Sequence, residues 1–185
     1  MKFKKILTIE LPEFKLEKKY WDMIDEFTNK RVSLSKESLQ IHKELSDTDC
    51  ILTGFGIKID KEIIDKTPKL KYVGVLATGF GGVDTAYAKS KNIVVTNVPG
   101  YATESVAEFV FAVILDHIRD LERGKNQAKE GNCSEAGFQA IEIKGKVFGV
   151  LGMGRIGTRV AELAKCFGAD VRYWSRNRKK EFIRD

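Results

Sequence analysis

The chain has 185 residues, of which 43% are hydrophobic and 31% charged, enough apolar side chains for one large globular core or two small ones. Its three cysteines, Cys50, Cys133 and Cys166, are far apart and form no CxxC pair, which argues against a disulfide framework or a metal site and favours a reducing, cytoplasmic location. The longest apolar run, residues 109–115, is much shorter than a membrane span, so no membrane partner is expected.

Short apolar segments alternate with helical patterns from the N-terminus onward. Strands are predicted near residues 5–9, 31–33, 50–53, 72–76 and 93–96, and helices near residues 16–27, 35–45, 60–66 and 84–90. The first apolar segment is only four residues long, too short for the core of a signal peptide. Such alternation is typical of a parallel sheet covered by helices. We therefore expect an α/β fold whose residues 1–100 form a flavodoxin-like parallel-sheet domain.

A long helix is predicted from Thr103 to about Arg123. It is apolar on nearly every side, so we expect it to be buried on several sides, as a helix between two domains would be. Ser105 and Glu108 have the spacing of a capping box with Ser105 as the N-cap, which would explain both residues without a ligand. The polar stretch that follows, residues 124–142, is predicted to be a loop with about one turn of helix.

A strand, a glycine turn and a helix follow one another directly after this stretch. The apolar run at residues 147–151 is typical of a buried parallel strand, and it enters the GxGxxG spacing of Gly152, Gly154 and Gly157. In a dinucleotide site these glycines allow the tight turn, the approach of the pyrophosphate and the close packing of the helix. The alternative is a glycine-rich turn of some other α/β protein.

The helix after the turn is predicted near residues 156–167, with Gly168 as its C-cap and a second strand at residues 170–174. Its first N–H groups, near Arg155 and Ile156, would point at cofactor phosphates. Two strands do not complete the six-stranded arrangement of a dinucleotide-binding fold. Residues 101–185 are therefore predicted to be a linking helix and the first part of an incomplete Rossmann domain.

The end of the second strand bears on cofactor choice. An NAD site uses an acidic residue here for the ribose hydroxyls, whereas an arginine can pair with the additional phosphate of NADP. Ser175 occupies the expected acidic position and Arg176 follows it. We therefore expect NADP or NAD as the cofactor, with NADP favoured. The alternative is that these arginines are exposed charges at a strand end.

The formal net charge of +6 is concentrated near the end of the chain, at Arg172, Arg176, Arg178, Lys179, Lys180 and Arg184. A solvated helix start or a phosphate-binding patch would each explain this cluster. Nucleic-acid binding ranks third, because no basic groove interleaved with aromatic residues and no known nucleic-acid motif accompanies it. No nucleic-acid partner is therefore expected.

Three motifs occur in order along the chain, at residues 76–84 (LATGFGGVD), 97–108 (NVPGYATESVAE) and 145–157. Together they resemble the D-isomer-specific 2-hydroxyacid dehydrogenases, and within them the glycerate dehydrogenase and hydroxypyruvate reductase group. The resemblance implies that residues 1–100 bind a small 2-hydroxy or 2-keto acid, whose carboxylate lies on the loop of Ala77, Thr78 and Gly79. It also implies that Thr103 faces the cofactor. Members of the family usually pair through the cofactor domain, so the resemblance offers a homodimer as a partner, and the shortened domain leaves this open. Consecutive N–H groups at the end of a parallel strand are a sensible anion site on physical grounds as well.

The family's catalytic histidine, glutamate and arginine motifs do not occur in these 185 residues, so no catalytic residue is predicted. Keto-acid reduction needs a general acid, and neither His42, on a predicted surface helix, nor His117, on the long helix, fits that role. The chain by itself is expected to be inactive, as the N-terminal part of such an enzyme. The alternatives are a non-catalytic dinucleotide-binding or regulatory module and a prematurely ended gene product.

Overall fold

The structure, a computed structural model, describes residues 2–38, 40–139 and 141–177. The chain forms two compact units, residues 1–99 and residues 100–185. Each unit contains its own parallel sheet and its own apolar core. Each unit is therefore described by itself.

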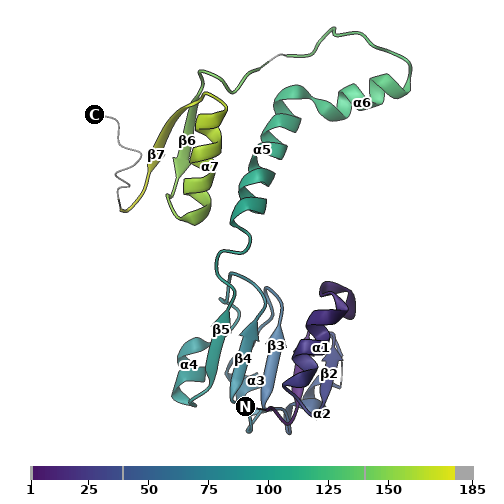
Figure 1. Cartoon of the computed structure of the whole chain (residues 1–185), viewed down its shortest axis with the longest axis vertical. Helices are drawn as coiled ribbons and strands as arrows, with labels where there is room; N and C mark the ends of the chain where they lie inside the picture. Colours follow the sequence, from purple (N-terminus) through teal and green to yellow (C-terminus); the bar gives the residue numbers. More distant parts are fainter. Residues whose placement is uncertain (1, 39, 140, 178–185) are drawn as a thin grey trace. The chain divides into compact units, whose positions relative to one another are not determined.

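Unit 1 is built on a five-stranded parallel sheet with the strand order β2-β1-β3-β4-β5 (Figure 1). Its strands are β1 (Ile6–Ile9), β2 (Arg31–Leu34), β3 (Cys50–Thr53), β4 (Tyr72–Val75) and β5 (Val94–Asn97). The registers are regular; Ile6, for example, pairs with Arg31 on one side and with Cys50 on the other. This 2-1-3-4-5 order is that of the flavodoxin-like fold, which confirms the expected fold class.

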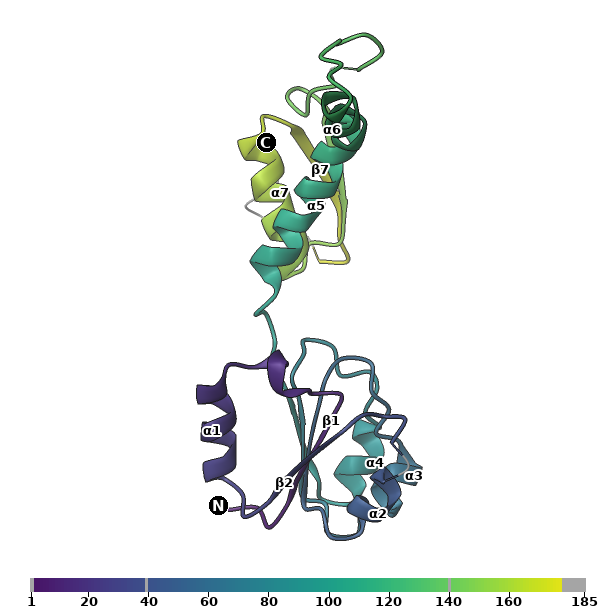
Figure 2. The same cartoon turned by 90° about the vertical axis from the view of Figure 1, so that its right-hand side faces the viewer.

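Helices cover both faces of this sheet, as Figure 2 shows. Helix α1 (Lys18–Glu26) lies on one face, whereas α2 (Ile41–Leu45), α3 (Lys61–Asp65) and α4 (Thr85–Ser90) lie on the other. A short 3-10 turn, Glu13–Lys15, precedes α1. The side chains of Asp60 and Asp84 cap α3 and α4 by accepting hydrogen bonds from the N–H groups of Ile63 and Tyr87. These caps stabilise two helices that are too short to be stable alone.

Helix α2 begins later than the sequence pattern predicts. The pattern favoured a helix from residue 35, but the helix begins at Ile41. Residues 35–38 form a turn instead, in which the Ser38 N–H donates to the Ser35 carbonyl oxygen over 3.1 Å. The Ser38 hydroxyl accepts from the Gln40 N–H. Serine side chains that bond nearby backbone groups compete with helix formation, and this accounts for the difference.

Unit 2 contains the parallel pair β6 (Val147–Leu151) and β7 (Asp170–Trp174), joined by α7 (Arg155–Cys166). The bounds of all three elements agree with the sequence prediction to within about one residue. The expected burial of β6 is not observed, because Val150 is its one buried residue and Leu151 is 88% exposed. Helix α5 (Thr103–Arg119) packs along α7, and the aromatic rings of Phe111 and Phe167 stack at 5.0 Å between their centroids. Gly168 follows α7 with a φ of 77°, as expected of a glycine that ends a helix.

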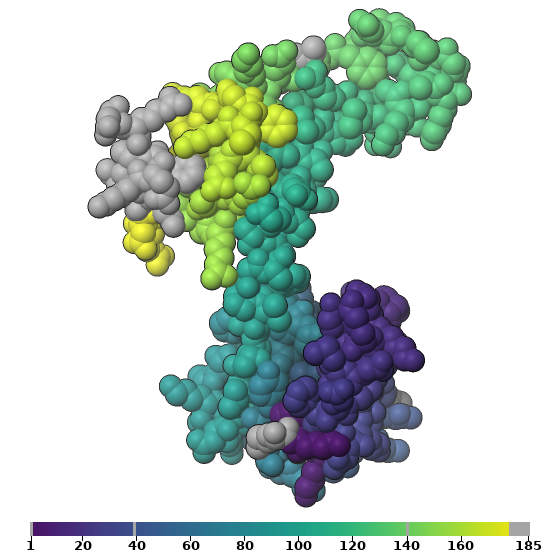
Figure 3. Space-filling model, in the orientation of Figure 1, coloured from purple at the N-terminus to yellow at the C-terminus, as the bar shows by residue number. Residues whose placement is uncertain are grey.

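The long helix begins at Thr103 as predicted but ends earlier than predicted. It stops at Arg119 because Asp120 has a left-handed φ of 50°, and a second helix, α6 (Leu121–Lys129), begins directly afterwards. The predicted loop over residues 124–142, with about one turn of helix, is therefore confirmed only in part: residues 124–129 belong to α6, and residues 130–139 contain no helix or strand. Residues of high helix propensity continue through α6, but none of them is buried, and Figure 3 shows this segment projecting at the upper right.

The first turn and the burial of α5 correct two other expectations. Because the helix begins at Thr103, Ser105 lies inside the first turn, where its hydroxyl donates to the Ala102 carbonyl oxygen. Ser105 is therefore not an N-cap. Of the residues of α5, Ala107 and Phe111 are buried, whereas Phe109 is 67% exposed. Burial on several sides is thus not observed in the described part of this chain.

Candidate functional site

The glycine turn between β6 and α7 has the geometry that each of its glycines requires. Gly152 has a φ of 101°, a left-handed value that favours glycine. A Cβ atom on Gly157 would lie 1.9 Å from the Gly152 carbonyl oxygen, so a side chain there would separate helix and turn. A Cβ on Gly154 would meet no atom within 4 Å. The turn is therefore tightly closed at Gly157 and open to an approaching group at Gly154.

Strand β7 holds this turn in place. The Gly152 N–H donates to the Trp174 carbonyl oxygen over 2.7 Å, and the Met153 N–H donates to the Ser175 hydroxyl over 3.4 Å. Met153 itself is buried in the core of unit 2. Ser175, which sequence analysis connected with the cofactor ribose, thus lies against the glycine turn, with its hydroxyl accepting a backbone hydrogen bond.

Arg155 and Thr103 come together at the start of α5. The Thr103 hydroxyl donates to the Gly100 carbonyl oxygen over 3.0 Å. The guanidinium of Arg155 lies against the same residue, since a Cβ on Gly100 would be 2.6 Å from Arg155 Nη1. Only glycine, here with a φ of 84°, leaves room for this approach. Ile156 is exposed beside them at the beginning of α7.

Arg159, one turn further along α7, is committed to carboxylates of the same unit. Its Nε donates to Glu104 over 2.8 Å and its Nη1 donates to Glu162 over 2.9 Å. These hydrogen bonds raise the pKa of Arg159 above its ordinary value. Arg155 has no carboxylate partner among the described residues, so it is the cation of this helix start that remains open to an anion.

The basic cluster near the chain end is only partly described. Arg172 lies on β7 and contacts Asp170 at 3.4 Å, and Arg176 is exposed just after the strand. Arg178, Lys179, Lys180 and Arg184 lie outside the described residues. Of the described residues in this cluster, Arg176 is the one next in sequence to Ser175, whose hydroxyl contacts the glycine turn.

The loop after β4 presents successive backbone donors. Among the described residues, no acceptor is found for the backbone N–H groups of Ala77, Thr78 and Gly79. The carbonyl groups are occupied instead: the Ala77 oxygen accepts from the Val98 N–H, and the Thr78 oxygen accepts from the Asn97 carboxamide over 2.7 Å. Successive unpaired N–H groups in a loop form an anion-binding concavity. Their position at the carboxyl end of a parallel strand is where ligands bind in such folds.

Phe55 and Asn97 belong to this loop region, although sequence analysis did not single them out. The Phe55 ring lies on Gly79, where a Cβ would be 3.0 Å from ring atom Cε2, and the side chain is 78% exposed. Asn97 fixes the loop through the bond to Thr78. A phenylalanine between two glycines directly after an apolar segment is the signal that could have identified Phe55 from the sequence.

The two histidines are remote in sequence from both loops. His42 is on α2 in unit 1, and His117 is exposed near the end of α5 in unit 2. Residues 2–38, 40–139 and 141–177 contain no group of three or more His, Cys, Asp or Glu side chains that could hold a metal ion. None of the helices in the described segments is both long and apolar enough to cross a bilayer.

The fold and the glycine turn define a parallel α/β protein with a strand-turn-helix unit of the dinucleotide-binding type. The family model for the D-isomer specific 2-hydroxyacid dehydrogenase catalytic domain matches residues 7–178. The chain therefore belongs to the family of D-isomer-specific 2-hydroxyacid dehydrogenases.

Relatives and solved structures agree with this assignment. A glyoxylate reductase of Pyrococcus horikoshii is 31% identical over 192 residues, which cover all of this chain and 57% of the relative. The D-lactate dehydrogenase of Aquifex aeolicus, complexed with NAD and lactic acid, superposes with a TM-score of 0.83 at 29% identity, covering 96% of this chain and 53% of that one. An acyclic imino acid reductase in complex with NADPH and D-Arg gives a TM-score of 0.80 at 27% identity, covering 95% of this chain and 58% of that one. The chain thus spans little more than half the length of these relatives.

Proposed function

We propose that this chain provides the substrate-binding and part of the cofactor-binding portion of an NAD(P)-dependent oxidoreductase of D-2-hydroxyacids or 2-keto acids, of the glyoxylate or hydroxypyruvate type. In this proposal residues 1–100 bind the substrate and residues 101–185 begin the cofactor domain. The observation that carries the proposal is the glycine turn, closed at Gly157 and open at Gly154. The name of the Pyrococcus horikoshii relative, a glyoxylate reductase, supports the substrate class.

The cofactor would be held by unit 2. Its pyrophosphate would lie over Gly152 and Gly154, at the N-terminus of α7, where free N–H groups and the helix dipole favour an anion. Arg155 adds a cation without a carboxylate partner among the described residues, and Thr103 lies beside it. When bound, a nicotinamide dinucleotide supplies hydride transfer, and the residues of this chain bind and orient it.

The substrate carboxylate would be held by unit 1. The unpaired N–H groups of Ala77, Thr78 and Gly79 provide hydrogen bonds that a carboxylate accepts. The exposed Phe55 ring on Gly79 would exclude water from one side of the bound acid. Because the two histidines lie on α2 and α5, away in sequence from this loop, we expect the 185 residues by themselves to bind ligands without turnover.

We further propose NADP rather than NAD as the preferred cofactor, because Ser175 stands at the acidic position and the exposed Arg176 can pair with a phosphate. Titration of the full chain with NADPH and NADH, followed by nucleotide fluorescence, tests this. Arg176→Ala should remove the preference, and Arg172→Ala, an exposed arginine on β7 that contacts Asp170, is the matched control. Tighter binding of NADH by the unmodified chain would contradict the preference.

The experiment for dinucleotide binding itself uses two glycines of the same unit. Gly154→Ala should weaken NADPH binding about tenfold, or about 1.4 kcal/mol, because the added methyl group occupies the approach to the turn. Gly149→Ala is the control, since a Cβ on Gly149 in β6 also meets no atom within 4 Å but lies outside the turn. Equal affinities of the two variants would refute the assignment of the turn.

A non-catalytic dinucleotide-binding or regulatory module is the second candidate, favoured by the absence of a histidine from either binding loop. It would bind NADPH as the first candidate does, but glyoxylate would not protect the loop of residues 77–79 from amide hydrogen exchange.

A homodimer is proposed as well, and the exposed Phe109 and Val113 of α5 offer apolar surface for it. Light scattering of the purified chain measures this. The three free cysteines support the proposal of a reducing, cytoplasmic location.

A further inference from the structure

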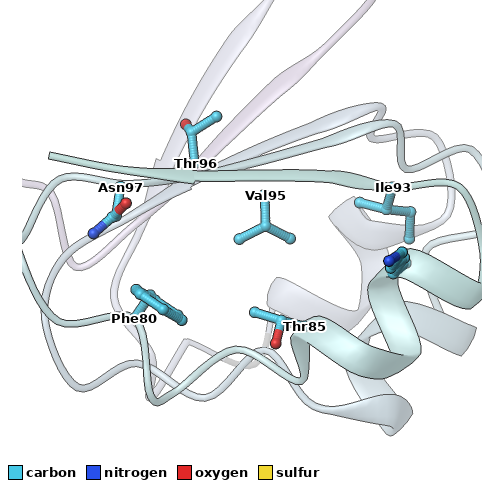
Figure 4. A pocket seen from close by; sticks show the side chains of 7 residues that line it. Phe80, Thr85, Ile93, Val95, Thr96 and Asn97 are labelled. Atoms are coloured by element: carbon cyan, nitrogen blue, oxygen red, sulfur yellow. The ribbon is translucent and has the colours of Figure 1, made fainter. Parts of the chain in front are cut away.

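Unit 1 has a cavity of about 300 Å³ that the proposed substrate loop does not itself form. It lies below the sheet at β5, between this strand and α4 (Figure 4). Phe80 and Asn97 stand at one end, Ile93 at the other, and Val95 points down from the strand between them. The volume is at the lower limit for small-molecule sites, so it fits a compact ligand and excludes a nucleotide.

The walls of this cavity are largely apolar. Phe80, Ile93 and Val95 all line it, and Phe80 is 48% exposed although its ring faces the cavity in Figure 4. Thr96 presents its backbone there, because its hydroxyl is hydrogen-bonded to the Tyr72 hydroxyl. A ligand that covers the Phe80 ring would remove apolar surface from water.

The charge of the cavity comes from one side chain. Lys89 lines it from α4, one turn after Thr85 and on the same face of the helix. No carboxylate among the described residues forms an ion pair with the Lys89 ammonium, and no acidic residue lines the cavity. The nearby Lys91 differs, because its ammonium lies 3.9 Å from Asp65. The Ile93 N–H donates to the Ala88 carbonyl oxygen, which places the Lys89 end of α4 beside Ile93.

We propose that this cavity is a second ligand site, for a small monocarboxylate with a compact apolar or aromatic body. The body packs against Phe80, Ile93 and Val95, and the carboxylate pairs with the Lys89 ammonium. Two of the lining residues connect the cavity to the substrate loop: Phe80 follows Gly79 directly, and Asn97 donates its hydrogen bond to Thr78. A ligand in the cavity therefore restrains the loop that presents the unpaired N–H groups, and acts as an effector of that loop.

The proposal can be tested with benzoate as the probe and the full 15N-labelled chain. Benzoate should shift the amide signals of Phe80, Val95 and Asn97 in a saturable way, with a Kd on the order of 1 mM. Lys89→Met should weaken this binding roughly fivefold, the value of one partly exposed ion pair. Lys91→Met, which removes a lysine paired outside the cavity, should leave it unchanged. Benzamide, of the same shape without the charge, should bind the unmodified chain more weakly than benzoate.

Three results would overturn the proposal. One is the absence of any saturable shift at these residues. Another is an equal affinity of the Lys89→Met and Lys91→Met variants for benzoate. The third is displacement of benzoate by glyoxylate with shifts centred on residues 77–79, which would make the cavity part of the substrate site. Because every arm measures binding to unit 1, the result does not depend on whether unit 2 binds a dinucleotide.

Discussion

Substituting Gly157 by alanine tests whether the glycine turn is closed as tightly as the structure indicates. The new Cβ would lie 1.9 Å from the Gly152 carbonyl oxygen. Ordinary contacts between carbon and oxygen are about 3.3 Å, so the turn or the helix would move by roughly 1 Å or more. The clashing atom belongs to the backbone and not to a flexible side chain, so rotation about a side-chain bond does not relieve the contact.

Replacing glycine by alanine inside a helix usually raises the free energy of unfolding, by up to about 1 kcal/mol. A decrease in this free energy would therefore point to the close contact at Gly157. Forcing an extra methyl group into a closed contact costs about 1–3 kcal/mol or more. We therefore expect Gly157→Ala to destabilise unit 2 by about 2 kcal/mol. Gly154→Ala is the matched control: its φ of −73° and ψ of −171° suit alanine and a Cβ there has open space, so the change should stay within about 0.5 kcal/mol.

Urea unfolding followed by circular dichroism, together with amide hydrogen exchange along α7, measures the effect. The exchange data attribute the loss of stability to unit 2, because only the amides of α7 and its two strands should exchange faster. If Gly157→Ala were as stable as the unmodified chain, with unchanged exchange in α7, the contact between helix and turn would not be as close as inferred. Equal destabilisation by Gly154→Ala would also refute the reasoning.

Three further predictions concern unit 1. Thr53 is fully buried and its hydroxyl has no hydrogen-bond partner among the described residues, so Thr53→Val should stabilise the unit by about 1 kcal/mol in urea unfolding; destabilisation would reveal a partner for the hydroxyl. Burial, together with the nearby charge of Asp49, raises the pKa of the Cys50 thiol to about 12, so at about pH 8 a thiol reagent should modify the two exposed cysteines and reach Cys50 only on unfolding. A hydrogen bond from Arg31 lowers the pKa of Asp25 below 3.8, so its stabilising contribution is present above the unfolded pKa and is lost as the pH falls through the folded value. Asp25→Asn should therefore flatten the loss of stability in acid, and an unchanged acid transition would contradict this.

Much of the local structure could be predicted from the sequence. Strands β6 and β7 lie where the sequence at residues 147–151 and 170–174 predicted them, because short apolar segments bounded by turn residues indicate strands. The expected burial of β6 is not observed, since Val150 is its one buried residue. The glycine spacing also predicted the turn. Glycine is favoured at Gly152 because φ is left-handed there, and it is required at Gly157 because there is no space for a side chain.

The errors were made where local signals compete. The polar stretch from residue 124 predicts a loop with about one turn of helix, but its first six residues continue α6, which begins after the left-handed Asp120. Ser105 and Glu108 have the spacing of a capping box, yet the helix begins at Thr103. In both cases the exact boundary of the helix depends on which backbone groups find partners, and local spacing does not specify this.

The sequence by itself determined the type of most elements, the α/β class, the glycine turn and the resemblance to the family, because these depend on the order and spacing of neighbouring residues. Only the tertiary structure decided which distant residues meet: Ser175 with Met153, Arg155 with Gly100, and Phe55 with Gly79. It also decided the strand order 2-1-3-4-5 and the cavity beside β5. Such contacts join residues about 20 to 55 positions apart, and they exist only once strands and helices have packed into one arrangement, which no local pattern specifies.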